Sequence, residues 1–230
     1  MKKIVITGAL GYIGTELCKL YSGFSWKYEV VAIDNRFISE RVNELKRRKI
    51  KFIQADILDL EAIKPYISQA EIVHHLAGIT DVAYVKKEAD KAKDELTRKV
   101  AVNGTANVLI SMNEKATIVF PSTHVVFEGL KEQKDNIDEN EETSTFLSYS
   151  SSKVENENQI KKSGKKYAIF RLGSVYGFST DTMRINIMPN LFSKIASQNG
   201  KIKLFGGGVQ LKSLVPLIDV ARCFKFVEEK

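Results

Sequence analysis

The chain has 230 residues, 43% of them hydrophobic, which is enough for one large domain with a buried core or for one domain and a smaller lobe. The net charge of +7 favours anionic partners, but the basic run at 46–51 has neither interleaved aromatic residues nor a nucleic-acid-binding motif, so we expect no nucleic acid. No apolar run reaches the ~18 residues of a membrane span, and the two distant cysteines form no disulfide framework, so we expect a cytoplasmic protein.

The first predicted element is a buried strand that leads through a glycine-rich turn into a helix at 11–22. In "VITGALGYIG" the glycines at positions 8, 11 and 14 lie between an apolar run and the helix. In the first such unit of a doubly wound sheet, the first glycine permits the tight turn. The second lets the backbone approach a pyrophosphate, and the third lets the helix pack closely on the strand. The pattern therefore predicts a dinucleotide at the helix N-terminus.

The second strand, "EVVAID", ends in Asp34, which lies 20 residues after Gly14. A carboxylate there would bind the hydroxyls of the adenosine ribose and would repel a 2′-phosphate, which favours NAD over NADP. Arg36 weakens this preference, because a nearby arginine can accommodate that phosphate. The alternative to a dinucleotide site is that the glycine turn has only a structural role and that Asp34 is an acid on the surface.

Further strands are expected at 51–56, 71–78, 117–122 and 167–173, and further helices at 38–48, 59–68, 86–113 and 145–163. Six strands alternating with five helices predict an α/β fold, a Rossmann-type doubly wound parallel sheet. A nucleotide-binding domain would span 1–173. A smaller, partial substrate lobe would span 174–230, with a helix at 182–198, a strand at 201–205, glycines at 206–208, a strand at 212–217 and a helix from Asp219.

A second candidate motif is "YSSSK", in which Tyr149 and Lys153 are four residues apart and so lie on one helix face. A tyrosine acting as a base near neutrality needs its pKa lowered by ~3 units. The lysine cation and the positive nicotinamide of an oxidised cofactor would both act in that direction. Thr123 ends the fifth strand, at the sheet edge where ligands gather, and its hydroxyl could bind the reacting oxygen.

We expect the three histidines and the acidic residues between Thr123 and Tyr149 to have structural roles. His74 and His75 are adjacent on a strand, so they face opposite sides and cannot hold one metal ion, and no metal is expected. The same alternation turns His124 away from a site that contains Thr123. The acids between Thr123 and Tyr149 are read as a solvated face, and they are Glu128, Glu132, Asp135, Asp138, Glu139, Glu141 and Glu142.

Taken together, these motifs resemble the NAD-dependent epimerase/dehydratase family of extended short-chain dehydrogenases/reductases, in particular UDP-glucose 4-epimerase. The similar segments are "TGALGYIG", "DNR", "ADILD", "HLAG", "VNGTANVL", "PSTHVVF", "YSSSK", "RLGSVYG" and "GGGVQLKSLVPLIDVA". The resemblance implies that NAD is bound by Gly8, Gly11, Tyr12, Ile13, Gly14, Asp34, Asn35, Arg36, Asp56, Ile57, Leu76, Ala77, Gly78, Asn103, Tyr149 and Lys153.

The resemblance also implies a reaction. Tyr149, assisted by Lys153 and Thr123, would remove a proton from a hydroxyl of a nucleotide sugar while hydride passes to NAD, and the keto sugar would take the hydride back on its other face. Substrate contacts are expected at Gln210, Lys212 and Arg171, although Lys212 stands where the family usually has an arginine. A homodimer is expected through the long helix and the helix of Tyr149.

This chain differs from the pattern of the family in two respects that limit what the resemblance implies. Dehydratases of the family carry Asp-Glu after the catalytic Thr, whereas this chain has His124 and Val125, which disfavours dehydration. Family members usually continue for many tens of residues, so the lobe resembles a shortened one. The alternatives are a nucleotide-sugar reductase, dehydrogenase or dehydratase of the same fold, and a non-catalytic dinucleotide sensor.

Overall fold

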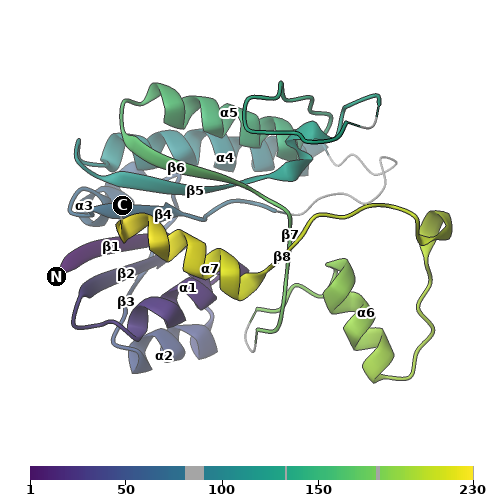
Figure 1. Cartoon of the computed structure of the whole chain (residues 1–230). Helices are drawn as coiled ribbons and strands as arrows, with labels where there is room; N and C mark the ends of the chain where they lie inside the picture. The colour runs from purple at the N-terminus through teal and green to yellow at the C-terminus, as the bar shows by residue number, and fades with distance from the viewer. Residues whose placement is uncertain (81–90, 133, 180–181, 230) are drawn as a thin grey trace.

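A computed structural model describes residues 1–80, 91–132, 134–179 and 182–229. Its main sheet contains six parallel strands: β1 (Lys2–Thr7), β2 (Tyr28–Asp34), β3 (Lys51–Gln54), β4 (Ile72–His75), β5 (Thr117–Thr123) and β6 (Lys166–Leu172). Their order is β3-β2-β1-β4-β5-β6 (Figure 1). The predicted parallel α/β sheet is therefore confirmed. The chain reverses its direction of winding between β1 and β4, and ligands bind at such a switch point.

Helices cover both faces of this sheet. One face carries α1 (Tyr12–Ser22), α2 (Ser39–Arg47) and α7 (Leu217–Phe226), and the other carries α3 (Leu60–Ile67), α4 (Lys91–Ser111) and α5 (Ser148–Lys162). The five helices predicted for the first domain are thus found, although residues 86–90 of the fourth lie outside the described residues. Every helix in the described part of the chain is too short or too polar to span a membrane.

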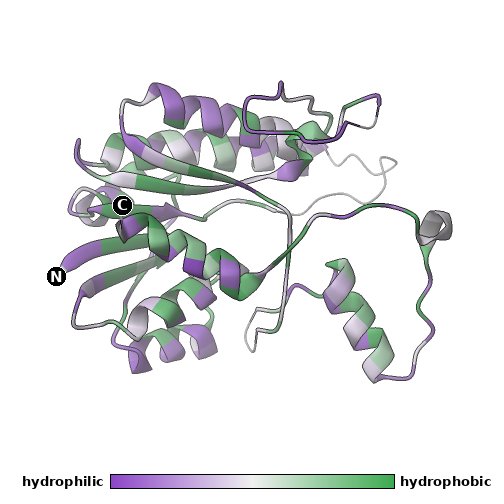
Figure 2. Ribbon diagram, in the orientation of Figure 1, coloured by the Kyte–Doolittle hydropathy of each residue, from purple (hydrophilic) through white to green (hydrophobic). Residues whose placement is uncertain are grey.

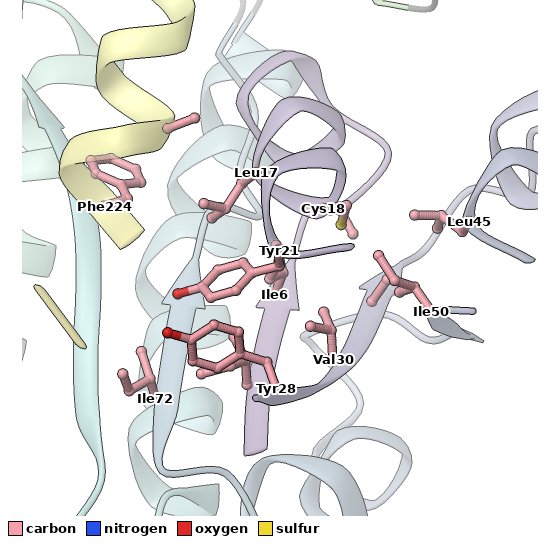
Figure 3. Close-up of a cluster of buried hydrophobic side chains, with 14 of the residues drawn as sticks. Ile6, Leu17, Cys18, Tyr21, Tyr28, Val30, Leu45, Ile50, Ile72 and Phe224 are labelled. Atoms are coloured by element: carbon pink, nitrogen blue, oxygen red, sulfur yellow. The ribbon is translucent and has the colours of Figure 1, made fainter. Parts of the chain in front are cut away.

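Each face has its own hydrophobic core. Hydrophobic residues run along the strands, whereas the helices alternate hydrophobic and hydrophilic residues, as expected when only one helix face is buried (Figure 2). Tyr21 of α1 and Tyr28 of β2 are in edge-to-face contact at 5.1 Å between ring centroids, and Figure 3 shows them among the side chains of β1, α1 and α7. Phe224 of α7 is fully buried in the same cluster.

The segment after β6 forms a small two-stranded parallel sheet of β7 (Ser174–Tyr176) and β8 (Leu214–Pro216), with α6 (Met188–Ser197) and the 3₁₀ turn Phe205–Gly208 between them. The strand predicted at 201–205 is wrong. Residues 201–204 have no regular structure, and Ile202 and Leu204 are 42% and 57% exposed. A strand needs a neighbour for its main-chain hydrogen bonds, and the described sheets offer none to this segment.

The last helix packs on the first half of the chain. It begins at Leu217, two residues before the predicted start, and buries Val220, Ala221 and Phe224 in the core shared with α1. Beyond it, Glu228 accepts a hydrogen bond from Tyr28 and pairs with Lys2 at 3.4 Å and Lys27 at 3.2 Å. These contacts join residues 217–228 to the sheet, while the boundary at residue 174 stays a prediction.

Candidate active site

The glycine turn joins the carboxyl end of β1 to the N-terminus of α1. Gly8 has a φ of 67°, and a Cβ there would lie 2.7 Å from the main-chain nitrogen of Ala77. A Cβ on Gly14 would lie 2.4 Å from the carbonyl oxygen of Gly8. The turn is therefore pressed against both the end of β4 and the first turn of α1, and side chains at these two positions would force it open.

Asp34 supports this turn from the end of β2. Its carboxylate is buried and accepts a hydrogen bond from the main-chain N–H of Leu10 at 3.0 Å. The other oxygen accepts from the N–H and the Nε of Arg36, both at 3.1 Å. Arg36 thus folds back onto Asp34. The acid is fixed beside the glycine turn, where the lone pairs that remain can accept from ribose hydroxyls.

The residues after β3 lie next to this acid. Asn35 donates to Asp56 Oδ2 at 3.2 Å, and Asp56 Oδ1 accepts from the N–H of Leu58 at 2.9 Å. Ile57 is 5% exposed, and a Cβ on Gly104 of α4 would lie 2.3 Å from its Cδ1. The side chain of Ile57 therefore packs into the core.

Asn103 of α4 is one of the residues that line a surface hollow next to the loop after β3. The hollow has a volume of about 420 Å³ and is lined by Leu58, Lys99, Asn103, Ala106 and Asn107. Asn107 donates to the carbonyl oxygens of Ile57 and Leu58, both at 3.0 Å, and so ties α4 to the loop after β3.

The segment after β4 lies beside the glycine turn at the carboxyl-end edge of the main sheet. The N–H of Leu76 donates to the carbonyl of Thr7 at 3.1 Å, and the N–H of Ala77 donates to the Thr7 hydroxyl at 3.2 Å. Gly78 is exposed, and a Cβ there would touch nothing within 4 Å. Its main chain is thus open to solvent at the switch point.

Two residues of α1 that were predicted to bind the cofactor have side chains that contact other parts of the protein. The Tyr12 hydroxyl donates to the carbonyl oxygen of Gly177 at 2.5 Å, and Ile13 packs against the core below α1. Their main-chain N–H groups in the first helical turn are the groups that a phosphate would meet. The close glycine turn, the buried Asp34 and the open edge after β4 fit a dinucleotide.

The predicted catalytic residues come together beside this edge. Thr123 ends β5 and is 8% exposed, while Tyr149 and Lys153 lie in the first turns of α5. The Lys153 Nζ lies 5.9 Å from the centroid of the Tyr149 ring and donates to the carbonyl of Pro121 at 2.7 Å. The side chain of Thr123 acts on Tyr149 in the direction that lowers the pKa of its phenol. The structure therefore places the three groups within reach of one small molecule.

In the protein without a bound dinucleotide, the pKa of Tyr149 is raised, so the lowering predicted for the complex with oxidised cofactor stays a prediction. Burial raises that pKa, and the charge of Arg184 and the hydrogen bond with Thr123 act in the opposite direction. Burial also lowers the pKa of Lys153 to about 8, against the attraction of Glu157. The two effects share one cause, since desolvation disfavours the charged forms of both groups.

Glu157 is a residue that the sequence analysis missed. It is 2% exposed and forms a paired ionic contact with Arg171, at 2.8 Å from Nη2 and 3.1 Å from Nε. It also accepts from the Ser122 hydroxyl at 2.5 Å. Tyr149, Lys153 and Glu157 recur every four residues on α5, and extending that spacing by one step would have identified it.

The three predicted substrate residues are not brought together. The guanidinium of Arg171 is engaged by Glu157 and lies 5.2 Å from the Phe127 ring, so it is part of the interior support of α5. Gln210 and Lys212 are exposed on the long segment before β8, which Figure 1 shows to the right of the main sheet as it leads back to β8. Their roles in substrate binding stay predictions.

The histidines have partners inside the protein. His74 contacts the Tyr21 hydroxyl at 2.8 Å, and His75 contacts the hydroxyls of Thr7 at 2.9 Å and Thr105 at 3.0 Å. Burial lowers the pKa of both to about 3, so they are neutral at physiological pH. In the part of the chain that the structure describes, no group of three metal-binding side chains occurs.

His124 does not lie on the strand from which its orientation was predicted. It begins a short 3₁₀ helix, His124–Phe127, because the Thr123 hydroxyl accepts from the N–H of Val125 at 3.3 Å. The His124 Nδ1 lies 2.9 Å from the carbonyl oxygen of Leu172 in β6. The strand alternation used in the prediction therefore does not apply, although the side chain is held by β6.

The curated proteins similar to this chain include one described as an epimerase. A putative UDP-glucose 4-epimerase from Methanocaldococcus jannaschii is 29% identical over 227 residues, which cover 95% of this chain and 71% of that protein. Matches to two other curated relatives cover 29% and 25% of those proteins' own lengths.

Solved structures share the fold. UDP-glucose 4-epimerase from Thermotoga maritima, solved with UDP-glucose, superposes with a TM-score of 0.82 at 23% identity, over 99% of this chain and 74% of that one. The dTDP-glucose 4,6-dehydratase DesIV from Streptomyces venezuelae, a double mutant solved with NAD, gives 0.79 at 19% identity, over 99% and 72%. The sequence model of the NAD dependent epimerase/dehydratase family matches residues 4–230. The chain therefore belongs to the NAD dependent epimerase/dehydratase family.

Proposed function

We propose that this protein is an NAD-dependent nucleotide-sugar epimerase in which Tyr149 is the catalytic base. The observation that carries the proposal is the meeting of Thr123, Tyr149 and Lys153 at the edge of the sheet that also holds the glycine turn. An epimerase needs a group that removes a hydroxyl proton and later returns it, and a tyrosine can do both, first as the phenolate and then as the phenol. The curated relative from M. jannaschii, described as a putative UDP-glucose 4-epimerase, supports this reaction class.

Each of the chain's own residues has a role in this proposal. Tyr149 takes a proton from a sugar hydroxyl and later gives it back, and Thr123 holds the same oxygen by a hydrogen bond. Lys153 adds positive charge that stabilises the phenolate. The first turn of α1 holds the diphosphate of NAD, and Asp34 holds its ribose. Bound NAD supplies the hydride acceptor and donor.

Two other reactions on the same fold remain as alternatives. A net reductase or dehydrogenase would use the same tyrosine but would release its cofactor in each turnover. A dehydratase is supported by the likeness to a dTDP-D-glucose 4,6-dehydratase from Dictyostelium discoideum, which is 24% identical over 251 residues. Val125 weighs against elimination, because a valine cannot transfer protons, and His124 is held by the main chain of Leu172.

Identification of the bound dinucleotide and the substrate tests the proposal. Purified protein is denatured and any dinucleotide released is identified. Native protein is then incubated with UDP-, GDP- and dTDP-hexoses and followed by NMR and by NADH absorbance. An epimerase interconverts two sugars without net NADH. Net NADH formation would indicate a dehydrogenase, loss of water a dehydratase, and bound dinucleotide without turnover a sensor.

A homodimer and a cytoplasmic location are also part of the proposal. The helices α4 and α5 lie side by side on one face, and Leu96 and Ile110 of α4 are 50% and 66% exposed. This outer surface supports pairing through the two helices, which light scattering can test. The two cysteines are free thiols, which is consistent with a reducing compartment.

A further inference from the structure

Three consecutive residues near the end of β5 contact the same face of α5. The Phe120 ring centroid lies 4.4 Å from the Lys153 Nζ, and the carbonyl oxygen of Pro121 accepts from that Nζ at 2.7 Å. The Ser122 hydroxyl donates to Glu157 at 2.5 Å. Because Lys153 and Glu157 are four residues apart on α5, they project from one face of the helix. The end of β5 is thus fixed to α5 at two successive turns.

The carbonyl oxygen that binds Lys153 lies beyond the end of the neighbouring strand. The last pair between β4 and β5 is His74 with Val119, and Pro121 lies two residues further along β5, where β6 is its neighbour in the main sheet. The side chain of Lys153 can therefore reach this carbonyl past the end of β4.

Ser122 fixes the peptide unit to which Lys153 binds. The carbonyl belongs to the peptide unit that joins Pro121 to Ser122, and a peptide unit is planar, so an anchor on Ser122 sets the direction of the carbonyl. Ser122 is 4% exposed, and its acceptor Glu157 is held in turn by Arg171 at 2.8 Å. Arg171 is the residue of β6 that pairs with Ser122, so one carboxylate joins neighbouring residues of two strands to α5.

Lys153 is the cation that the structure places next to Tyr149, at 5.9 Å from the ring centroid. Glu157 attracts its charge, and the nearby His75 is neutral, since burial lowers the pKa of that imidazole to about 3. A cation stabilises a phenolate less as the distance between them grows, so the position of the Lys153 ammonium matters for the proposed base.

We propose that Ser122 is a positioning residue of the proposed reaction, which, through the carbonyl of Pro121, holds the ammonium of Lys153 beside the ring of Tyr149. The inference rests on the proposed role of Tyr149 as base. The Ser122 hydroxyl is engaged by Glu157, so Ser122 acts through Lys153 and not on the substrate. Loss of this hydrogen bond frees the peptide to turn, and the ammonium then loses its fixed place beside the ring.

The test is a pH titration of the absorbance of tyrosinate in the presence of saturating NAD⁺. Each protein is compared with the same protein carrying Tyr149→Phe, so that the difference reports Tyr149 alone among the 8 tyrosines. In Ser122→Ala we expect the pKa of Tyr149 to rise by about one unit, the lower end of the effect of a nearby opposite charge. Ser122→Thr keeps the hydroxyl and should titrate like the unaltered protein. Arg184 and Thr123, which also act on Tyr149, are present in every variant.

The matched control is Ser152→Ala. Ser152 is 2% exposed, but its hydroxyl donates within α5, to the carbonyl of Ser148 at 2.6 Å. This variant should titrate like the unaltered protein. Both alanine variants should fold, because Asn156 and Gln159 also hold α5, by donating to main-chain carbonyls of α4 at 2.9 and 3.1 Å. Retained NAD binding checks that they do.

A second background separates the route through Lys153 from a general disturbance of the site. When Ser122→Ala is added to Lys153→Met, the titration of Tyr149 should stay where Lys153→Met alone places it. In the otherwise unaltered protein, Ser122→Ala should lower kcat about tenfold below the pKa of Tyr149, because the phenolate fraction falls by that factor, and should leave KM unchanged.

An unchanged titration in Ser122→Ala, an equal shift in Ser152→Ala, or a shift that persists in full in the Lys153→Met background would overturn the inference. The absorbance measurement needs no substrate, so it decides the role of Ser122 even if no nucleotide sugar is epimerised. Conversely, active epimerisation with an unchanged titration would remove Ser122 from the account and leave the proposed function standing.

Discussion

Glu157 connects the helix of the candidate base to two strands beneath it. Its carboxylate is bound by Arg171 of β6 and by Ser122 of β5, and it attracts Lys153 one turn earlier on α5. Arg171 and Ser122 hold the pKa of Glu157 below its ordinary value despite burial. A single carboxylate therefore holds α5 against the sheet and favours the charged form of Lys153.

Replacing Glu157 tests this support. Glu157→Ala leaves Arg171 without its partner in a largely buried site, and we expect the free energy of unfolding to fall by about 3 kcal/mol. The lowered pKa means that the carboxylate stabilises the fold above its ordinary pKa of 4.5 and loses this effect as the pH falls through the lowered value. The difference between unaltered protein and Glu157→Gln should therefore shrink below pH 4.5 in denaturant titrations.

The neighbouring Glu155→Gln is the matched control. Glu155 pairs with Arg98 at 2.6 Å, but the two side chains are 34% and 55% exposed. Exposed pairs contribute about 0.2–1 kcal/mol, so this variant should change stability little. Equal losses for the Glu155 and Glu157 variants would contradict the account of Glu157.

Gly11 offers a second test at the level of one residue. It is the N-cap of α1, with a φ of −82°, and a Cβ there would lie 3.1 Å from the carbonyl oxygen of Gly8. The fold can therefore accept an alanine with a small shift, but the methyl group would stand where the diphosphate approaches. We expect Gly11→Ala to weaken NAD binding at least about tenfold, or 1.4 kcal/mol, in calorimetric titrations.

Gly23→Ala is the corresponding control, because its Cβ would lie 3.5 Å from the carbonyl of Leu20, an ordinary contact at the other end of α1. Its NAD affinity should match that of the unaltered protein. Full NAD affinity in Gly11→Ala would place the dinucleotide elsewhere.

Among the elements, α5 depends on an acid from the loop before it. Glu128 belongs to the acidic run that the sequence analysis assigned to a solvated face, and for this residue the assignment is wrong. Its Oε1 accepts from the N–H groups of Phe146 at 3.2 Å and Leu147 at 2.8 Å, and from the Ser150 hydroxyl. The carboxylate thus fixes the start of the helix that presents Tyr149, where negative charge is also favoured by the helix dipole.

Glu128→Ala should lower the free energy of unfolding by about 1–2 kcal/mol, the usual cost of losing a helix cap. It should also reduce turnover, because the first turn of α5 carries Tyr149. Glu132→Ala, in the exposed part of the same loop, is the control and should leave both quantities unchanged. Unfolding curves and rates that are identical for the two variants would show that Glu128 does not hold the helix.

At the scale of the molecule, the repeating parts of the fold were predictable and the contacts between distant segments were not. The strands could be predicted because apolar runs such as that ending in Asp34 are buried on both faces. The contacts of Glu157 and Glu128 are made with partners 14 and 19 residues away in sequence, so local patterns do not indicate them. The exposed segment 201–204 failed as a strand for the same reason, because apolar spacing does not supply a partner strand.

In the candidate site, too, local spacing could be predicted from the sequence whereas properties that depend on the folded structure could not. The spacing of Tyr149 and Lys153, together with the position of Thr123 at a strand end, predicted a candidate site, and the roles of these three residues stay predictions. The electrostatics could not be predicted, because the pKa values of Tyr149 and Lys153 depend on burial, which moves both toward their neutral forms. The charge that would stabilise the phenolate is therefore a property of the folded site and cannot be obtained from the spacing of residues on α5.

The most direct test of the central claim is a transfer experiment with a nucleotide sugar that carries deuterium on the carbon to be epimerised. Followed by NMR, the unaltered protein should interconvert the two epimers, keep the deuterium on that carbon and form no net NADH. Tyr149→Phe should bind NAD with the same affinity and show no conversion. Loss of the deuterium to solvent, or full turnover by Tyr149→Phe, would contradict the account.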